Sequence, residues 1–299
     1  MANSHLFTYV PLLFLALSPM SNAMQVLPKF REPDGVSSTF ARLPYGETFF
    51  KNAIGRCSNG LLMIDFIALS AGFPLLKPYK EMGANFAHGV NFAIASSTAL
   101  TVETLAANNT LSPKTSNILD VQWDWNMPRS NRLVNHSSRT KFIDEDCAEK
   151  NANSLFMVGE IGGNDYNFQN QVYYSIKSIQ ELEDMVPQIV CTIANPVRVS
   201  FSFSWTFFCG RPGNFPIGCL PIYLTGFQTN DSTAYNENSI ALKFVVTIQA
   251  IEELKIEHPN TTIIYGDYYN AFVWVLSQAP FFGFDLNSLQ KACCGSGGT

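Results

Sequence analysis

The feature that most constrains the fold is a short apolar run that recurs three times and ends each time in a polar or glycine-rich turn. The runs cover residues 89–95, 155–158 and 261–265 and open onto a Ser/Thr cluster, a glycine-rich loop and a Gly-Asp pair. Continuous apolar runs of this length are typical of strands that are buried on both faces, as in a parallel sheet. We therefore expect an α/β fold with a central parallel sheet.

Two stretches carry the spacing of an amphipathic helix. Apolar residues recur every three or four positions over 176–193, where Pro187 predicts a kink or a restart. A second pattern covers 242–255 and ends near His258. In sheets with helices on both faces, ligands bind beyond the carboxyl ends of the strands. The loops that follow the three apolar runs are therefore the first places to look for chemistry.

Composition excludes several classes of protein. Of the 299 residues 46% are hydrophobic and 14% charged, which is the composition of a packed globular chain. Nineteen Lys and Arg against 24 Asp and Glu give a net charge of −5, so neither DNA nor RNA is an expected partner. No repeat, low-complexity tract or flexible linker divides residues 24–299, and we expect a single domain there.

Residues 1–23 have the pattern of a secretory signal peptide. An apolar run extends from about Leu6 to Leu17, and Ser21 and Ala23 stand at positions −3 and −1 of a cleavage site before Met24. The run is short for a bilayer span, so no stable membrane anchor is expected. Because no Lys or Arg precedes it, an uncleaved buried element is the alternative. The pattern predicts secretion to the extracellular space or the cell wall.

Glycosylation sequons and cysteines fit the same route. Four Asn-x-Ser/Thr sequons occur, at Asn108, Asn135, Asn230 and Asn260. Seven cysteines lie beyond residue 23, and in an oxidising compartment most are expected to form disulfides, with at least one left over. No CxxC spacing is present, so the sequence does not support a zinc site.

The glycine-rich loop 159–165 (GEIGGND) leaves two interpretations open. Its glycines permit close approach of a ligand, and Asn164 then has the side-chain amide that stabilises an oxyanion. Alternatively, Asn164 and Asp165 form an Asx-type turn and cap their own backbone. A nucleotide-binding loop is excluded, because neither GxGxxG nor the Walker A pattern occurs. The Pro- and Gly-rich segment 212–219 predicts only a shaped loop.

Seven stretches together carry a family resemblance, in the family's own order. They are 43–50 (LPYGETFF), 55–66 (GRCSNGLLMIDF), 89–100 (GVNFAIASSTAL), 154–166 (SLFMVGEIGGNDY), 212–219 (PGNFPIGC), 263–271 (IIYGDYYNA) and 291–295 (KACCG). In these stretches the chain resembles the plant GDSL-type esterases/lipases of the SGNH hydrolase superfamily. The resemblance implies a flavodoxin-like, three-layer α/β sandwich. It also implies a secreted carboxylic-ester hydrolase that needs no cofactor and takes a small ester or acyl substrate.

Such enzymes use a Ser-His-Asp triad and an oxyanion hole. The resemblance assigns the oxyanion side chain to Asn164, in the GxND block that Gly162 opens. The family usually has glycine near Ser96, where a serine still offers an N–H but tolerates fewer backbone angles. The oxyanion role of the Ser96 N–H is therefore in doubt.

The triad itself is not found. The interval 24–42, where the family has its Gly-Asp-Ser block, contains Ser37 and Ser38 on a charged segment, and we interpret both as surface serines. None of the four histidines completes the family's DxxH block, so nucleophile and base stay unassigned. The stretch 195–209 alternates Ser and Phe where relatives continue a helix into a strand, which predicts a local misfit.

Three interpretations of function follow. The chain is a secreted ester hydrolase that is catalytically impaired, or a non-catalytic secreted protein that retains the pocket and binds an acyl or glycan ligand, or the product of a truncated gene model whose sheet is incomplete. The natural ester, the acyl chain length, the disulfide pairing and the oligomeric state are not predicted.

Overall fold

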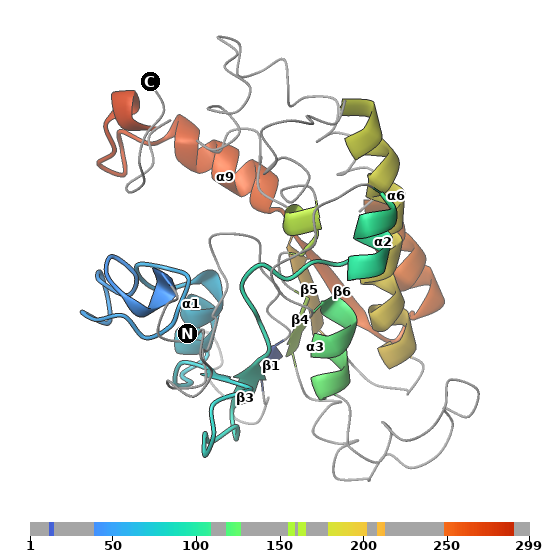
Figure 1. Cartoon of the computed structure of the whole chain (residues 1–299), viewed down its shortest axis with the longest axis horizontal. Coiled ribbons are helices and arrows are strands. Elements are labelled where there is room, and N and C mark those ends of the chain that lie inside the picture. The colour runs from blue at the N-terminus through green and yellow to red at the C-terminus, as the bar shows by residue number, and fades with distance from the viewer. Residues whose placement is uncertain are drawn as a thin grey trace, which may run out of the picture.

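The computed structural model describes residues 12–14, 39–108, 118–126, 155–158, 161–165, 179–201, 208–212 and 248–289. Within them, all paired strands run parallel (Figure 1). The strands are β1 (Leu12–Phe14), β2 (Lys77–Pro78), β3 (Gly89–Asn91), β4 (Leu155–Met157), β5 (Phe208–Pro212) and β6 (Thr262–Gly266). The expected α/β fold with a parallel sheet is confirmed.

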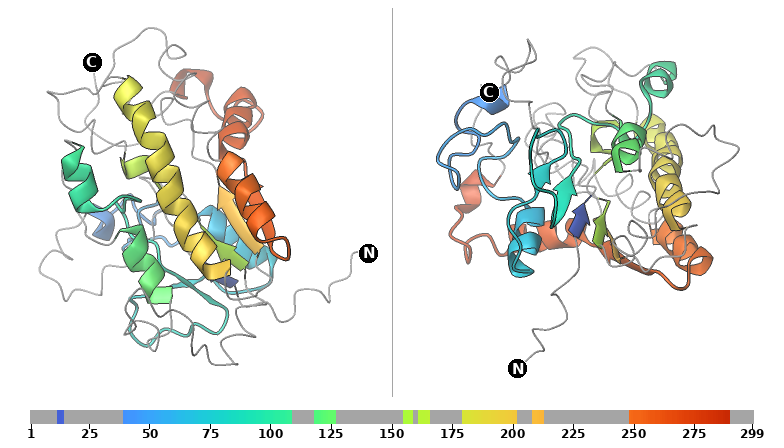
Figure 2. Two further views of the ribbon diagram at one scale, coloured as in Figure 1. Left: turned by 90° about the vertical axis from the view of Figure 1, so that its right-hand side faces the viewer. Right: turned by 90° about the horizontal axis from the view of Figure 1, so that it is seen from below.

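The strands form two three-stranded sheets that meet edge to edge. Their orders are β1-β3-β2 and β4-β5-β6, and β1 lies beside β4 (Figure 2). The combined order is β2-β3-β1-β4-β5-β6. Apart from the two-residue β2 at the edge, this is the flavodoxin-like order, in which chain connections reverse direction between the first and third strands. That switch point lies between β1 and β4, and it locates the expected ligand edge.

Helices cover both faces of the sheets, which gives three layers (Figure 2). On one face α1 (Met63–Ser70) and α9 (Tyr268–Ser277) share a buried cluster with Met157 of β4. The other face carries α2 (Val102–Ala107), α3 (Leu119–Asn126), α6 (Ile179–Phe201) and a helix over 248–257. Phe156 packs into this second cluster, so neighbouring residues of β4 serve opposite faces, as the two-residue period of a strand requires. The described elements also include two short 3-10 helices, Thr39–Ala41 and Leu286–Ser288, and a helical stretch over 163–165.

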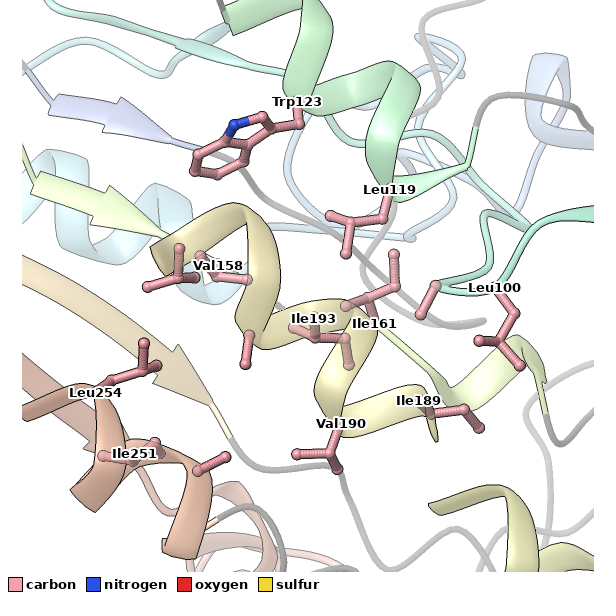
Figure 3. Packing of buried hydrophobic residues seen from close by; sticks show 14 of the residues in the cluster. Leu100, Leu119, Trp123, Val158, Ile161, Ile189, Val190, Ile193, Ile251 and Leu254 are labelled. Carbon is pink, nitrogen blue, oxygen red and sulfur yellow. The ribbon is translucent and has the colours of Figure 1, made fainter. Parts of the chain in front are cut away.

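The larger core is built on α6. Its buried side chains Ile189, Val190 and Ile193 face Ile161, Leu119 and the helix that carries Ile251 (Figure 3). This apolar stripe continues from Met185 to Val197. Burying a side chain of this size contributes about 1.5–3 kcal/mol.

The restart predicted as one of two outcomes at Pro187 is wrong, and the kink stays a prediction. The helix continues through Pro187 and Pro196 to Phe201. A proline inside a helix costs about 3 kcal/mol, and the buried stripe along α6 is long enough to offset it. Within the stretch 195–209, where a local misfit is predicted, α6 ends at Phe201 and β5 begins at Phe208. Residues 202–207 lie outside the described residues, so the misfit stays a prediction.

Strand positions agree with the apolar runs, and the ends differ by a few residues. The first run is extended only as far as Asn91, because the Asn91 side chain accepts a hydrogen bond from the N–H of Ala93 (2.9 Å) and turns the chain. The helix predicted over 242–255 is described from 248 and ends at 257, just before His258. Of the loop predicted over 212–219, the structure describes only Pro212, as the last residue of β5.

Of the segment predicted to be a signal peptide, the structure describes only Leu12–Phe14, as β1. The boundary after residue 23 and the single domain beyond it stay predictions. None of the helices in the described ranges is both long and apolar enough to span a bilayer.

Candidate active site

The turns that follow β3 and β4 meet at the carboxyl edge of the sheets, on either side of the switch point. The side-chain amide of Asn164 donates a hydrogen bond from Nδ2 to the carbonyl oxygen of Ser97, at 2.8 Å. Both residues are buried, with 3% and 1% of their surface exposed. Two of the three loops in which we expected chemistry, 96–98 and 159–165, are therefore joined by a direct bond. The third, 266–270, forms the start of α9, where the Asp267 side chain accepts from the N–H of Asn270.

Asp165 ties the same two turns together more strongly. Its carboxylate accepts hydrogen bonds from the backbone N–H groups of Ala99 (2.9 Å) and Leu100 (2.8 Å), one on each oxygen. The Asp165 side chain is completely buried. Hydrogen bonds to an ionised acceptor are about twice as strong as neutral ones. The carboxylate therefore fixes the backbone at the end of the β3 turn.

Helix α3 holds the turn from a third side. Gln122 donates from Nε2 to the hydroxyl of Ser97 (2.9 Å), and the N–H of Leu119 donates to the carbonyl of Thr98 (3.1 Å). The Thr98 hydroxyl in turn donates to the carbonyl of Leu100 at 2.8 Å. The turn is thus held by side chains from two separate segments, which is the rigid support that a pre-organised site needs.

The Asn164 side chain reaches across to the other turn. The oxyanion role of Asn164 stays a prediction. The role of Gly162 in the same block stays a prediction as well.

Ser96 has φ +65°, in the left-handed region that favours glycine. This conformation explains why glycine suits the position, and it shows that serine adopts the same turn. Whether the Ser96 N–H faces an oxyanion stays a prediction.

Replacing Ser96 by glycine is expected to raise the free energy of unfolding by about 0.5–1 kcal/mol. The left-handed conformation costs a non-glycine residue about 1–2 kcal/mol, and the greater freedom of glycine in the unfolded chain cancels about 0.4–1 kcal/mol of the gain. Urea denaturation followed by tryptophan fluorescence measures the change. As a control, Ser70→Gly in α1 is expected to destabilise by about 0.5 kcal/mol, because that serine is helical. A loss of stability in Ser96→Gly would contradict the backbone strain inferred at Ser96.

Gly162 is needed for two separate reasons. Its φ is +97°, and a Cβ placed there would lie 2.8 Å from Cγ2 of Ile189 in α6. Gly162 thus allows the segment after β4 to approach the helix that carries the core. The glycine keeps Asn164 and Asp165 next to the β3 turn.

Gly162→Ala is expected to destabilise the protein by about 2–5 kcal/mol, which combines backbone strain of about 1–2 with overpacking of about 1–3 kcal/mol. Gly72→Ala is the matched control, because Gly72 has φ +77° with nothing within 4 Å of the added Cβ. The control should therefore lose only the strain component. Thermal melts of both variants measure the difference, and equal losses would contradict the close contact with Ile189.

The two described histidines lie at the opposite edge of the sheets. His88 directly precedes β3 and stacks on Phe73, with ring centroids 5.2 Å apart. His258 follows the helix 248–257 and precedes β6, with Nε2 3.9 Å from a Glu257 carboxylate oxygen. In parallel strands these are the amino ends, so neither ring lies beside the Asn164 turn. His5, His136, Ser37 and Ser38 fall outside the described residues.

The remaining predicted site residues are only partly described. Asn260 is exposed in the turn before β6, and Asn108 is half-buried at the end of α2. Asn135 and Asn230 lie outside the described residues, and all four glycosylation sites stay predictions. Among the described residues no three His, Cys, Asp or Glu side chains gather as a metal site would require.

Burial raises the pKa of the Cys57 thiol to about 11, whereas Cys191 is a free thiol exposed on α6. The disulfides expected for most of the cysteines therefore do not include Cys191. A thiol with such a raised pKa is a poor nucleophile, because the thiolate is the reactive form.

Sequence reasoning missed the residues that hold the site together. Asp165 and Gln122 were not predicted to support the β3 turn, and the only signal was the position of Asp165 next to Asn164 in the GxND block. The buried pair of Arg56 and Asp65 was also missed. The Arg56 guanidinium contacts both carboxylate oxygens of Asp65 at 2.8 Å. Asp65 additionally accepts a hydrogen bond from the N–H of Leu62 at 2.7 Å.

A parallel sheet of flavodoxin-like order, with a buried asparagine-aspartate cluster at the carboxyl edge of its switch point, defines an α/β protein of the SGNH hydrolase type. The profile of the GDSL-like lipase/acylhydrolase family matches residues 45–299. The chain belongs to this family.

Curated relatives agree with this assignment. The chain is 36% identical to acetylajmalan esterase 1 of Rauvolfia serpentina over 272 residues, which cover 89% of this chain and 68% of that protein. Acetylajmalan esterase 2 of the same plant is 38% identical, over 95% of this chain and 75% of the relative. A GDSL esterase/lipase of Arabidopsis thaliana is 36% identical, over 85% of this chain and 65% of the relative.

Proposed function

We propose that this chain is a secreted carboxylic-ester hydrolase by descent that retains the oxyanion half of the active site and turns over esters at a negligible rate. The observation that carries the proposal is the cluster of Asn164, Asp165 and Ser97 at the carboxyl edge. The names of the relatives support ester substrates.

In an ester hydrolase this edge would receive the substrate carbonyl. The tetrahedral intermediate places negative charge on the former carbonyl oxygen, and fixed donors of the type of the Asn164 amide stabilise that charge. An attacking hydroxyl needs a base within hydrogen-bond reach to become a good nucleophile. The sequence has neither a Gly-Asp-Ser block nor a DxxH histidine, which supports negligible turnover.

Secretion is part of the proposal and rests on the sequence of residues 1–23 and on the four sequons. Of the two described sequons, Asn260 is better placed for glycosylation than Asn108, because Asn260 is exposed in a turn and Asn108 is half-buried. We propose that the protein is located in the extracellular space or the cell wall.

The test measures hydrolysis of short-chain p-nitrophenyl esters, together with labelling by a fluorophosphonate, which marks activated serines covalently. We expect no hydrolysis above the blank and no label, while an acetylajmalan esterase assayed in parallel gives both. Hydrolysis accompanied by labelling would refute the proposed impairment. The labelled peptide would then identify the nucleophile, and Ser37→Ala and Ser38→Ala would test the two serines considered above.

A second candidate is a non-catalytic ligand-binding protein, which the buried turn at Ser97 favours, because side chains from two other segments hold it in place. A site that is held rigidly before a ligand arrives binds at low entropic cost. If the midpoint temperature of a cooperative thermal melt rises when a short-chain acyl ester is added, and no product is released, binding is supported. A cooperative melt whose midpoint temperature no tested ester changes would count against the binding function.

A further inference from the structure

Helix α9 is apolar on nearly all sides but lies largely uncovered. It carries no charged residue, and within it only Tyr268 is buried. Trp274 is 57% exposed, and the two valines beside it, Val273 and Val275, are also exposed. A helix that is apolar all round is normally enclosed by other elements. Figure 1 shows α9 running from the sheets to the periphery of the molecule, so a partner can reach it.

The turn that follows α9 continues the same apolar surface. Phe281, Phe282 and Phe284 are 84%, 44% and 55% exposed, and Leu286 follows them at 62%. The Phe282 ring lies edge-on to the rings of Trp274 and Phe281, with centroids 5.5 Å and 5.4 Å apart. These five residues, Trp274, Phe281, Phe282, Phe284 and Leu286, are called the aromatic face below.

Backbone hydrogen bonds hold the aromatic face in shape. The N–H groups of Phe281 and Phe282 donate to the carbonyl of Gln278, and the N–H of Phe284 donates to the carbonyl of Ala279 at 3.0 Å. Gly283 has φ +83°, which lets the chain turn back at the end of the helix. A surface that is fixed before its partner arrives loses little conformational entropy on binding, so this face is suited to association.

The size of the aromatic face fits the apolar part of a dimer interface. An aromatic side chain offers about 150–250 Å², so the exposed parts of the four rings amount to about 350–600 Å². A stable interface buries about 800 Å² per partner, of which about 65%, or roughly 500 Å², is apolar in homodimers. A two-fold axis brings the same patch of both copies together, so one such face per chain suffices.

The charges around the aromatic face favour a second copy of the chain over a lipid surface. Residues 258–290 contain no Lys or Arg and two acids, Asp267 and Asp285. Segments that bind membrane surfaces combine apolar residues with Lys or Arg, which attract anionic lipids. The two carboxylates accept hydrogen bonds from the N–H groups of Asn270 and Asn287, so each caps its own helix. Depletion of charge is typical of the centre of a protein interface.

We propose that the aromatic face is the contact surface of a two-fold homodimer of this chain. Aromatic side chains at the centre of an interface carry most of its binding energy, so Trp274 and Phe281 are expected to dominate the affinity. The proposal concerns assembly and goes beyond the proposed function, because it does not depend on whether the chain hydrolyses esters.

Sedimentation equilibrium of the purified chain, at concentrations on both sides of about 1 µM, tests the proposal. Interfaces of this size have dissociation constants of about 1 µM or lower, so we expect the mass of two chains at the higher concentrations. Phe281→Glu places a charge in the aromatic face and is expected to raise the dissociation constant about tenfold or more. A monomer at every concentration would overturn the proposal.

Met82→Glu is the matched control, because Met82 is 83% exposed outside the aromatic face and receives the same charge. Its dissociation constant should stay within about twofold of the parent. A dimer that is equally stable in Phe281→Glu and Met82→Glu would overturn the proposal. Should a thermal melt show that Phe281→Glu does not fold, Trp274→Gln takes its place, and unchanged dimerisation in that variant would overturn the proposal in the same way.

Co-sedimentation with phosphatidylcholine vesicles tests the lipid alternative on the same samples. We expect the parent chain to stay in solution, because its aromatic rings are covered by the second copy. A monomeric chain that binds the vesicles, and loses that binding in Phe281→Glu, would assign the aromatic face to a lipid surface and overturn the homodimer.

Discussion

Replacing Arg56 by methionine is expected to lower the free energy of unfolding by about 3–5 kcal/mol, because it leaves the Asp65 carboxylate buried without its cation. The side chains of Arg56 and Asp65 are 2% and 1% exposed, and two contacts of 2.8 Å join them. The Arg56 guanidinium also lies 5.2 Å from the ring centroid of Phe50, a cation–π contact that methionine loses. Urea denaturation of the purified variant measures the change.

A double-mutant cycle separates the pair from the rest of its surroundings. Asp65→Asn retains an oxygen that accepts from the N–H of Leu62, so the variant Arg56→Met/Asp65→Asn removes both charges and keeps the start of α1. We expect the double variant to lose about 1–3 kcal/mol less than the sum of the two single variants. The control is Lys255→Met in the exposed pair with Glu252, which should change stability by about 0.5 kcal/mol or less. Additive single losses would contradict the buried ion pair.

Asp165→Ala is expected to destabilise the protein by about 2–6 kcal/mol, because two buried N–H groups each lose an acceptor at about 1–3 kcal/mol. The loss should also increase amide exchange near Asp165 more than in distant parts of the protein. Amide exchange at Ala99 and Leu100 is therefore expected to accelerate in Asp165→Ala more than exchange at residues of β6. Denaturation and hydrogen exchange measured on one sample report both quantities.

The control for Asp165 is another acidic residue that has the same chemistry without the burial. Asp124 is exposed on α3, and Asp124→Ala should stay within about 0.5 kcal/mol of the parent. If Asp165→Ala behaved like Asp124→Ala, the carboxylate would not be what holds the β3 turn to the segment after β4.

The strands and the meeting of their loops were predictable because their signals are local. Runs of apolar residues indicated strands at the observed positions, and the rule that ligand loops lie at the carboxyl ends of parallel strands brought 96–98 and 159–165 together. The course of α6 was not predictable in this way. Pro187 is a local signal for a break, and burial of the stripe around Ile189 overrides it only once the core is assembled.

By itself the sequence determined the α/β class, the family resemblance and the types of residue available at the edge of the sheet. Only the tertiary structure decided that Asp165 bonds to amides 65 and 66 positions earlier in the chain, that Arg56 neutralises Asp65, and that Leu12–Phe14 lies between β3 and β4. Strand and helix patterns depend on neighbours a few residues apart, so they can be read along the chain. A buried charge or a central strand is fixed by partners that folding brings together from far apart, and no local spacing encodes which partner that will be.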